Sequence, residues 1–101
     1  MVKHIILWTL RADMTADEKQ RAAQGMKKGL EGLAGKIDGL VNIKVVADGR
    51  LSTSNADVML DSTLKDFDSL KAYAVHPLHV DVADRLVRPF TAQRTCLDYE
   101  V

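Results

Sequence analysis

The chain opens with VKHIILWTL, Val2–Leu10, a run of β-branched, aromatic and other apolar residues without glycine or proline. Such a run predicts a β-strand. Because successive side chains of a strand point to opposite faces, His4, Ile6 and Trp8 share one face and Ile5 lies on the other. Both faces are largely apolar, whereas a strand with one wet face alternates apolar and polar residues. We therefore expect this strand to be covered on both sides.

A long helix is predicted after this strand. Thr15-Ala16-Asp17-Glu18 is a capping box, in which the threonine side chain accepts from the third helical N–H and the glutamate reaches back. Apolar residues then recur at helical spacing at Met26, Leu30, Leu33 and Ile37. We expect the helix to run to about Ile37.

Turn and breaker residues divide the rest of the chain. The expected elements are strands at Val41–Ala47 and Ala56–Ser62, a helix marked by Leu64, Phe67 and Leu70, a short helix between Pro77 and Pro89, and a strand at Thr91–Glu100. This order is the split βαβ arrangement of α+β, ferredoxin-like folds, a four-stranded antiparallel sheet with helices on one face. The other face would be bare in a single chain, so the two-sided first strand predicts a two-fold homodimer.

Composition limits the class of protein. A length of 101 residues predicts one domain over residues 1–101. Fourteen basic residues balance fourteen acidic ones without a basic run, which argues against nucleic-acid binding. The apolar run near the start is too short to span a bilayer, and the single Cys96 excludes an internal disulfide. We expect a cytoplasmic protein that uses neither a membrane nor nucleic acid.

The segment Tyr73-Ala74-Val75-His76-Pro77-Leu78-His79 concentrates the proton-transfer chemistry of a chain with only three histidines and two tyrosines. An imidazole with a pKa of about 6.5 is a suitable base for a carbon acid between two carbonyls. A phenol that stays protonated at neutral pH can donate to an enolate or carbonyl oxygen. Tyr73 and His79 are therefore the candidate catalytic pair. The alternative is that both make satisfied structural hydrogen bonds.

Three further residues are candidates for substrate binding. His4 and Trp8 share a strand face with Ile6 and could line a cavity between sheet and helices, although a histidine and a tryptophan there also fit a plain core or interface. His76 is included, although its place before Pro77 also suits a helix cap. No third ligand accompanies the histidines at 76 and 79, and no phosphate loop follows a strand, so we expect no metal and no cofactor.

Several segments together resemble the stress-responsive α/β-barrel (Dabb) family. They are Val2–Leu7, Tyr73–His79, Val87–Phe90, and Arg94 with Asp98-Tyr99-Glu100, and the likeness spans nearly the whole chain. The resemblance implies a ferredoxin-like subunit whose sheet pairs with that of a second subunit in a dimeric α+β barrel. It therefore implies the same homodimer that the strand pattern predicts.

The family includes the plant olivetolic acid cyclases, which close a linear poly-β-ketone into an aromatic acid. Their working tyrosine and histidine correspond to Tyr73 and His79, and their first-strand histidine corresponds to His4. A further pocket histidine of those enzymes falls at Val58, which departs from the pattern.

Three functions are compatible with these observations. The first is a stress-responsive protein that binds a small apolar or aromatic molecule in a pocket without turning it over. The second is a polyketide cyclase-like lyase or isomerase that uses Tyr73 and His79 for proton transfer. The third, by fold analogy alone, is a cofactor-free monooxygenase acting on phenols.

Overall fold

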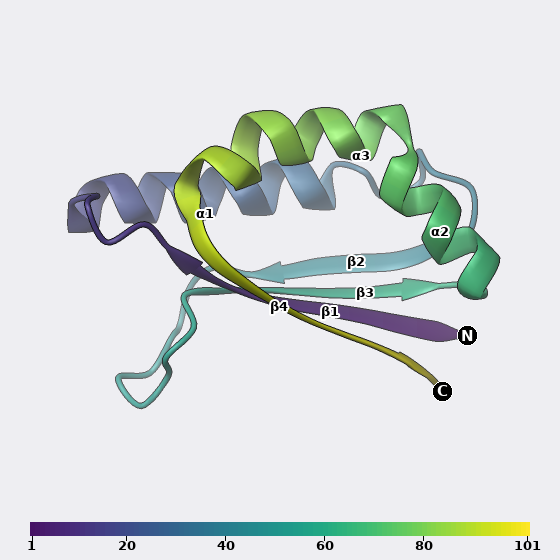
Figure 1. Cartoon of the computed structure of the whole chain (residues 1–101), viewed down its shortest axis with the longest axis horizontal. Coiled ribbons are helices and arrows are strands. Elements are labelled where there is room, and N and C mark those ends of the chain that lie inside the picture. Colours follow the sequence, from purple (N-terminus) through teal and green to yellow (C-terminus); the bar gives the residue numbers. More distant parts are fainter.

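A four-stranded antiparallel sheet forms one layer and the helices lie together over one of its faces (Figure 1). The computed structural model describes residues 1–101. Its elements are β1 Val2–Leu10, α1 Ala16–Glu31, β2 Leu40–Val46, β3 Val58–Leu64, α2 Phe67–Val75, α3 Pro77–Val82, a π-helical turn Ala83–Val87, a 3-10 turn Arg88–Phe90 and β4 Thr91–Glu100. The strand order is β2-β3-β1-β4. This confirms the predicted ferredoxin-like fold.

The central strand β1 pairs with β3 on one side and β4 on the other. Its His4, Ile6 and Trp8 are buried on the inner face, the face that the helices cover. The Ser62 hydroxyl of β3 donates to the backbone oxygen of His4 over 2.8 Å, which satisfies a buried polar group beside the core. The helices and the inner face thus enclose one hydrophobic core within a single chain.

The first helix is shorter than the apolar spacing predicts. It ends at Glu31, and Gly32 caps it, so the expectation of a helix to Ile37 is wrong. Gly35 follows with a φ of +75°, a conformation that L side chains rarely adopt, and the chain turns there. Leu33 and Ile37 are nevertheless buried, because the turns continue over the same core. Helical spacing therefore identified the core contacts correctly and the helix end incorrectly.

The third strand lies two residues later than predicted. It runs over Val58–Leu64, and Leu64 is a fully buried strand residue and not part of a helix. The second helix begins only after Asp66, whose carboxylate accepts from the backbone N–H of Ser69 over 2.7 Å. Asp66 is an N-cap, a signal that a reading based on apolar spacing missed.

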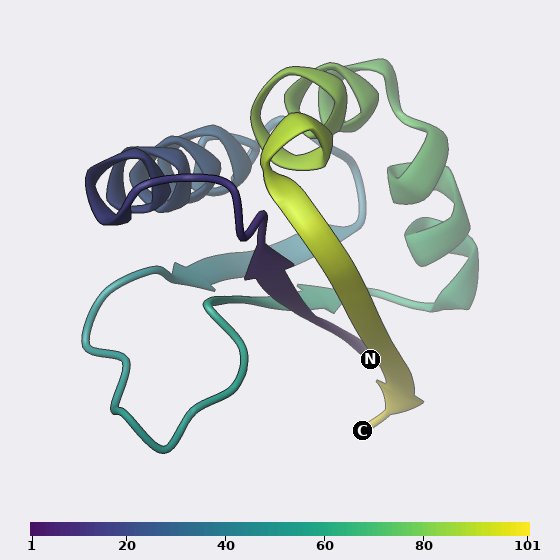
Figure 2. The ribbon, with the colours of Figure 1, turned by 60° about the vertical axis from the view of Figure 1, so that its left-hand side comes forward.

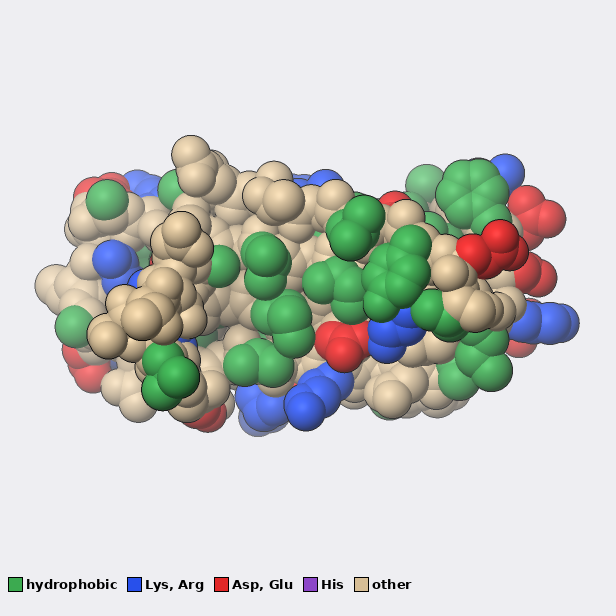
Figure 3. Space-filling view, turned by 90° about the horizontal axis from the view of Figure 1, so that it is seen from below, with side chains coloured by type: hydrophobic (Ala, Val, Ile, Leu, Met, Phe, Trp, Pro, Cys, Tyr) green, Lys and Arg blue, Asp and Glu red, His purple; other side chains and the backbone are tan.

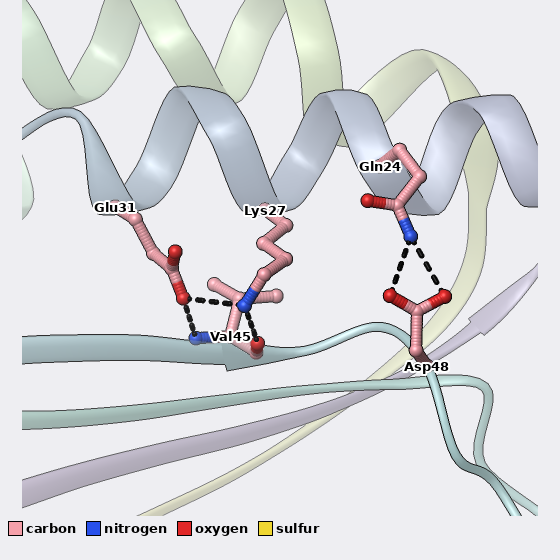
Figure 4. A network of polar contacts seen from close by, with 5 residues as sticks. All are labelled: Gln24, Lys27, Glu31, Val45 and Asp48. Atoms are coloured by element: carbon pink, nitrogen blue, oxygen red, sulfur yellow. Dashed lines mark hydrogen bonds and ion pairs between the residues drawn. The ribbon is translucent and has the colours of Figure 1, made fainter.

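The edge strand β2 is tied to α1 by side chains (Figure 4). Glu31 Oε2 accepts from Val45 N–H, and Lys27 Nζ donates to Val45 O, each over 2.9 Å. Nearby, Gln24 Nε2 donates to the Asp48 carboxylate over 2.8 Å. Unpaired backbone groups at a sheet edge invite pairing with another chain. At Val45 this edge is therefore occupied from within the molecule.

The outer face of the sheet carries an apolar group that we call the outer patch. Its residues are Ile5, Leu7, Val46, Met59, Leu97 and Tyr99, which the strand registers place on one side. Figure 3 shows hydrophobic side chains gathered across the middle of this face. Within it, Lys3 Nζ lies 2.6 Å from Asp61 Oδ1, so these two charges are already paired.

The strand β4 forms the opposite edge and extends beside β1 away from the helices (Figure 2). Its residues from Ala92 to Glu100 are exposed, although they pair with β1 along nearly its whole length. None of the helices has both the length and the apolar character that crossing a bilayer requires.

Candidate functional site

A cavity of about 370 Å³ lies between the inner face of the sheet and the segment from α2 to β4. Its floor is apolar, with Ile6, Trp8 and Leu60 from the strands. Tyr73 of α2 and His79 of α3 also line it. Large apolar walls with a few polar groups are typical of small-molecule pockets. The geometry of those polar groups therefore decides what the pocket can do.

Tyr73 contributes a hydroxyl without a partner. Its side chain has no exposed surface, and the hydroxyl oxygen makes no hydrogen bond with any other group of the protein. Burial raises the pKa of Tyr73 to about 12, so the phenol is protonated at neutral pH. A buried hydroxyl without a partner costs free energy, and native structures rarely keep one without a reason. The donor proton of this hydroxyl is therefore unused within the protein.

His79 lies against Tyr73, with ring centroids 4.3 Å apart. Its Nδ1 is 3.2 Å from the carbonyl oxygen of Ala74, and because a carbonyl can only accept, Nδ1 carries the proton. The other ring nitrogen, Nε2, is then a free acceptor. Burial lowers the pKa of His79 below its usual value, and nearby positive charges act in the same direction. At neutral pH His79 is therefore an uncharged base.

His4 completes a row of three rings, its centroid 6.1 Å from that of Tyr73. The ring is buried, and its Nδ1 hydrogen-bonds Asp98 Oδ1, directly across from it on β4. Since an ionised carboxylate can only accept, Nδ1 again carries the proton and Nε2 is left free. Tyr73 is thus flanked by the imidazoles of His4 and His79, and in each ring Nδ1 is hydrogen-bonded to the protein.

The structure brings together four of the five residues singled out in the sequence. Tyr73, His79, His4 and Trp8 all line the pocket. His76 is not among the lining residues, and its Nδ1 accepts from the backbone N–H of Leu78 over 3.1 Å, which caps α3. A role for His76 in substrate binding stays a prediction, and its observed contact is structural.

Sequence reasoning missed the contributions of the last strand and the turn before it. Arg88 and Arg94 line the pocket, and Asp98 and Cys96 lie next to His4. The available signal was the pairing of the first and last strands in a ferredoxin-like sheet. That pairing places Asp98 opposite His4, although the two residues lie some ninety positions apart in the sequence. The spacing of a local motif cannot reveal such a contact.

His4, Cys96 and Asp98 are the residues that could hold a metal ion, because their ligand atoms lie within 4.8 Å of one another. The Cys96 thiol donates to Asp98 Oδ1 over 3.4 Å. Burial raises the pKa of Cys96 most, and the neighbouring Asp98 carboxylate raises it further. These three groups satisfy one another through hydrogen bonds, so none of them calls for an ion. The absence of a metal stays a prediction.

A larger hollow, of about 590 Å³, lies at the start of α1 against the 3-10 turn. Its charges are already used within the protein. Arg11 pairs with Asp13, Arg21 with Asp17, and Glu18 belongs to the capping box. The smaller pocket, with its unpartnered hydroxyl and free imidazole nitrogens, is therefore the candidate site.

A ferredoxin-like domain with a pocket between sheet and helices, lined by a phenol and two imidazoles, is the class of protein that this architecture defines. The chain belongs to the stress-responsive A/B barrel domain (Dabb) family, whose model matches residues 2–101. This confirms the family expected from the sequence. A search among curated proteins finds no relative of this chain.

Solved structures resemble the chain over nearly its full length. A dimeric protein of unknown function with a ferredoxin-like fold from Bacteroides fragilis is 32% identical, with a TM-score of 0.90 over 99% of this chain and 95% of that one. A dimeric ferredoxin-like protein of unknown function from Thermobifida fusca is 25% identical, with a TM-score of 0.77 over 99% and 90%. The hydroxynitrile lyase of Passiflora edulis is 13% identical, with a TM-score of 0.69 over 97% and 90%, and shares the fold alone.

Proposed function

We propose that this protein binds a small organic molecule in the pocket around Tyr73. The observation that carries the proposal is the buried Tyr73 hydroxyl, which has no partner in the protein and belongs to a ring flanked by two imidazoles with free Nε2 atoms. A ligand with an oxygen acceptor on an apolar body would satisfy that hydroxyl and fill the apolar floor. The cytoplasmic location expected from the composition stays a prediction, and so does the part in the stress response that the family resemblance implies.

We also propose that the protein is a homodimer joined through the outer patch. An apolar patch on a solvated sheet face marks an interaction surface. Leu97 and Tyr99 of this patch are 62% and 44% exposed in the single chain. The Bacteroides fragilis protein, 32% identical over nearly the whole chain, is described as dimeric. Pairing two outer faces about a two-fold axis would cover the patch of both chains at once.

A titration with 4-butylbenzyl alcohol tests the pocket. Trp8 is the only tryptophan and lines the cavity, so its fluorescence reports occupancy. We expect saturable binding, weakened about 10-fold by Tyr73→Phe, the equivalent of losing one hydrogen bond of about 1.4 kcal/mol. Tyr99→Phe, on the outer face, is the matched control and should leave affinity unchanged. Equal affinity of wild type and Tyr73→Phe would remove the basis of the proposal.

A second candidate is a lyase or isomerase that moves protons with the same residues. It is favoured by the opposed pKa shifts, because burial keeps Tyr73 protonated as a donor and His79 neutral as a base. In the proposed step, His79 Nε2 removes a proton from carbon next to a carbonyl. The electron pair moves to the carbonyl oxygen, to which the Tyr73 hydroxyl donates, and the proton later returns from His79 to carbon.

Deuterium exchange separates the enzyme from the binding protein. Phenylacetone exchanges its benzylic protons slowly in neutral D2O, and NMR follows that exchange directly. An enzyme accelerates the exchange, and His79→Gln then returns it to the buffer rate while the alcohol still binds. A binding protein leaves the exchange at the buffer rate, whether or not His79 is present.

A further inference from the structure

All of the ionisable side chains that line the pocket are bases or a neutral phenol, and none is a carboxylate. Arg88 and Arg94 add two guanidinium groups to the histidines already described. Arg94 stands on β4 directly opposite Trp8 of β1, which places its backbone beside the apolar floor. The charges of the lining are therefore of one sign.

The two arginines differ in what they already bind. Arg88 Nη1 donates to the carboxylate of Asp84 one turn earlier. Arg94 forms no ion pair within the chain, and the polar side chain that its guanidinium approaches is the Cys96 thiol, not a carboxylate. The nearest carboxylate on the same strand, Asp98, is occupied by His4 and Cys96. A guanidinium without a carboxylate beside an apolar pocket is suited to an external oxyanion, which it can bind through two parallel N–H donors.

We propose that the pocket selects organic anions, in the form of a carboxylate on an apolar body, with Arg94 holding the charged group. This rests on the proposed function, because it assigns a ligand class to the same pocket. The apolar body lies over Trp8 and Leu60, and a carboxylate oxygen also accepts from the Tyr73 hydroxyl. Such an anion accepts from the unpartnered phenol and also balances the charge of the unpaired guanidinium, and a neutral ligand cannot do the second.

The positive charges near His79 support the same preference for an anion. Arg88 and Arg94 both disfavour a positive charge on His79 and so contribute to its lowered pKa. A field that disfavours a cation at that ring favours an anion in the space beside it. The guanidinium charges would also stabilise the enolate oxygen if the pocket turns over a ketone.

A matched pair of ligands tests the inference. At pH 7, 4-butylbenzoate and 4-butylbenzyl alcohol share the same apolar body and differ in charge. We expect the acid to bind at least about 10-fold more tightly than the alcohol at low salt, with the difference shrinking as salt is added. Arg94→Met should remove that advantage and leave the affinity for the alcohol within about twofold, because the methionine keeps the apolar stem of the side chain.

Controls separate this inference from the proposed function. Arg21→Met, on the exposed face of α1, removes the same charge far from the pocket and should change neither affinity. If the alcohol binds as tightly as the acid, or if Arg94→Met weakens both equally, the pocket stands and its preference for anions is refuted. If neither ligand binds to the wild type, the proposed pocket is refuted and the ligand class with it.

Discussion

The two faces of this sheet use the same strands and differ in what completes them. On the inner face, the helices cover Ile6 and Leu60, and the only buried side-chain oxygen left there without a partner is that of Tyr73. On the outer face, Leu7 and Leu97 remain exposed in a single chain. Neighbouring residues of one strand therefore serve different purposes, because their side chains alternate between the faces. In our proposals, the inner face encloses a ligand and the outer face meets a second chain.

The largest expected effect comes from removing a side chain of the inner face. Leu60 is almost fully buried among the core residues. Leu60→Ala should lower the free energy of unfolding by about 2–5 kcal/mol, because it loses apolar burial and leaves a cavity. Urea denaturation measures this change. A loss below about 1 kcal/mol would mean that the inner face is not a packed core.

A charge on the outer face should break assembly and leave the core intact. Leu97→Asp would place two like charges in a two-fold interface, and we expect dimer dissociation to become at least about 100-fold more favourable, or roughly 2.7 kcal/mol. Sedimentation velocity at micromolar concentration measures it. Val75→Asp is the control, since Val75 is as exposed as Leu97 but belongs to α2 in the helical layer. A dimer that survives Leu97→Asp and dissociates with Val75→Asp would reverse the assignment of the two faces.

A smaller change in the free energy of unfolding, towards greater stability, is expected from Tyr73→Phe. Because its hydroxyl is buried without a partner, Tyr73→Phe should leave the ligand-free protein as stable as the wild type or more stable by about 1 kcal/mol. Thermal unfolding without ligand checks this. A destabilisation of 2 kcal/mol or more would show that the hydroxyl has a structural partner.

The smallest expected effect is a pH dependence from His79. Its folded pKa lies below the unfolded value of about 6.5, so the unfolded chain binds more protons as the pH falls through that value. The contribution of His79 to stability is therefore present above pH 6.5 and is lost below it, until the folded pKa is reached. Denaturation between pH 5 and 8 should show a shallower slope for His79→Gln. A steeper slope would mean that the folded pKa is raised.

The fold was predictable because its signals are local and mutually consistent. The apolar run of Val2–Leu10 and the capping box at Thr15 correspond to β1 and to the start of α1. The end of α1 was not predictable from apolar spacing, since Leu33 and Ile37 pack into the core from turns. Spacing along the chain reports which residues are buried, and a helix and a following turn can bury the same positions.

The candidate site was predictable in part. The motif around Tyr73 and His79 is contiguous, and the face of β1 placed His4 and Trp8 with it. The arginine and the aspartate of β4 reach the site only through strand pairing, and nothing adjacent in sequence marks them. The state of the Tyr73 hydroxyl was also beyond the sequence, because it depends on which atoms surround it in three dimensions.

The central claim is that the inner face binds a small molecule while the outer face joins two chains. A 15N NMR titration with 4-butylbenzoate tests both halves in one sample, because relaxation reports the size of the particle and the shifts locate the ligand. We predict a particle twice the mass of one chain, with shifts at the Trp8 indole and at Tyr73, His79 and Arg94, and none at Leu97. A folded particle of single-chain mass, or shifts confined to the outer patch, would contradict the account.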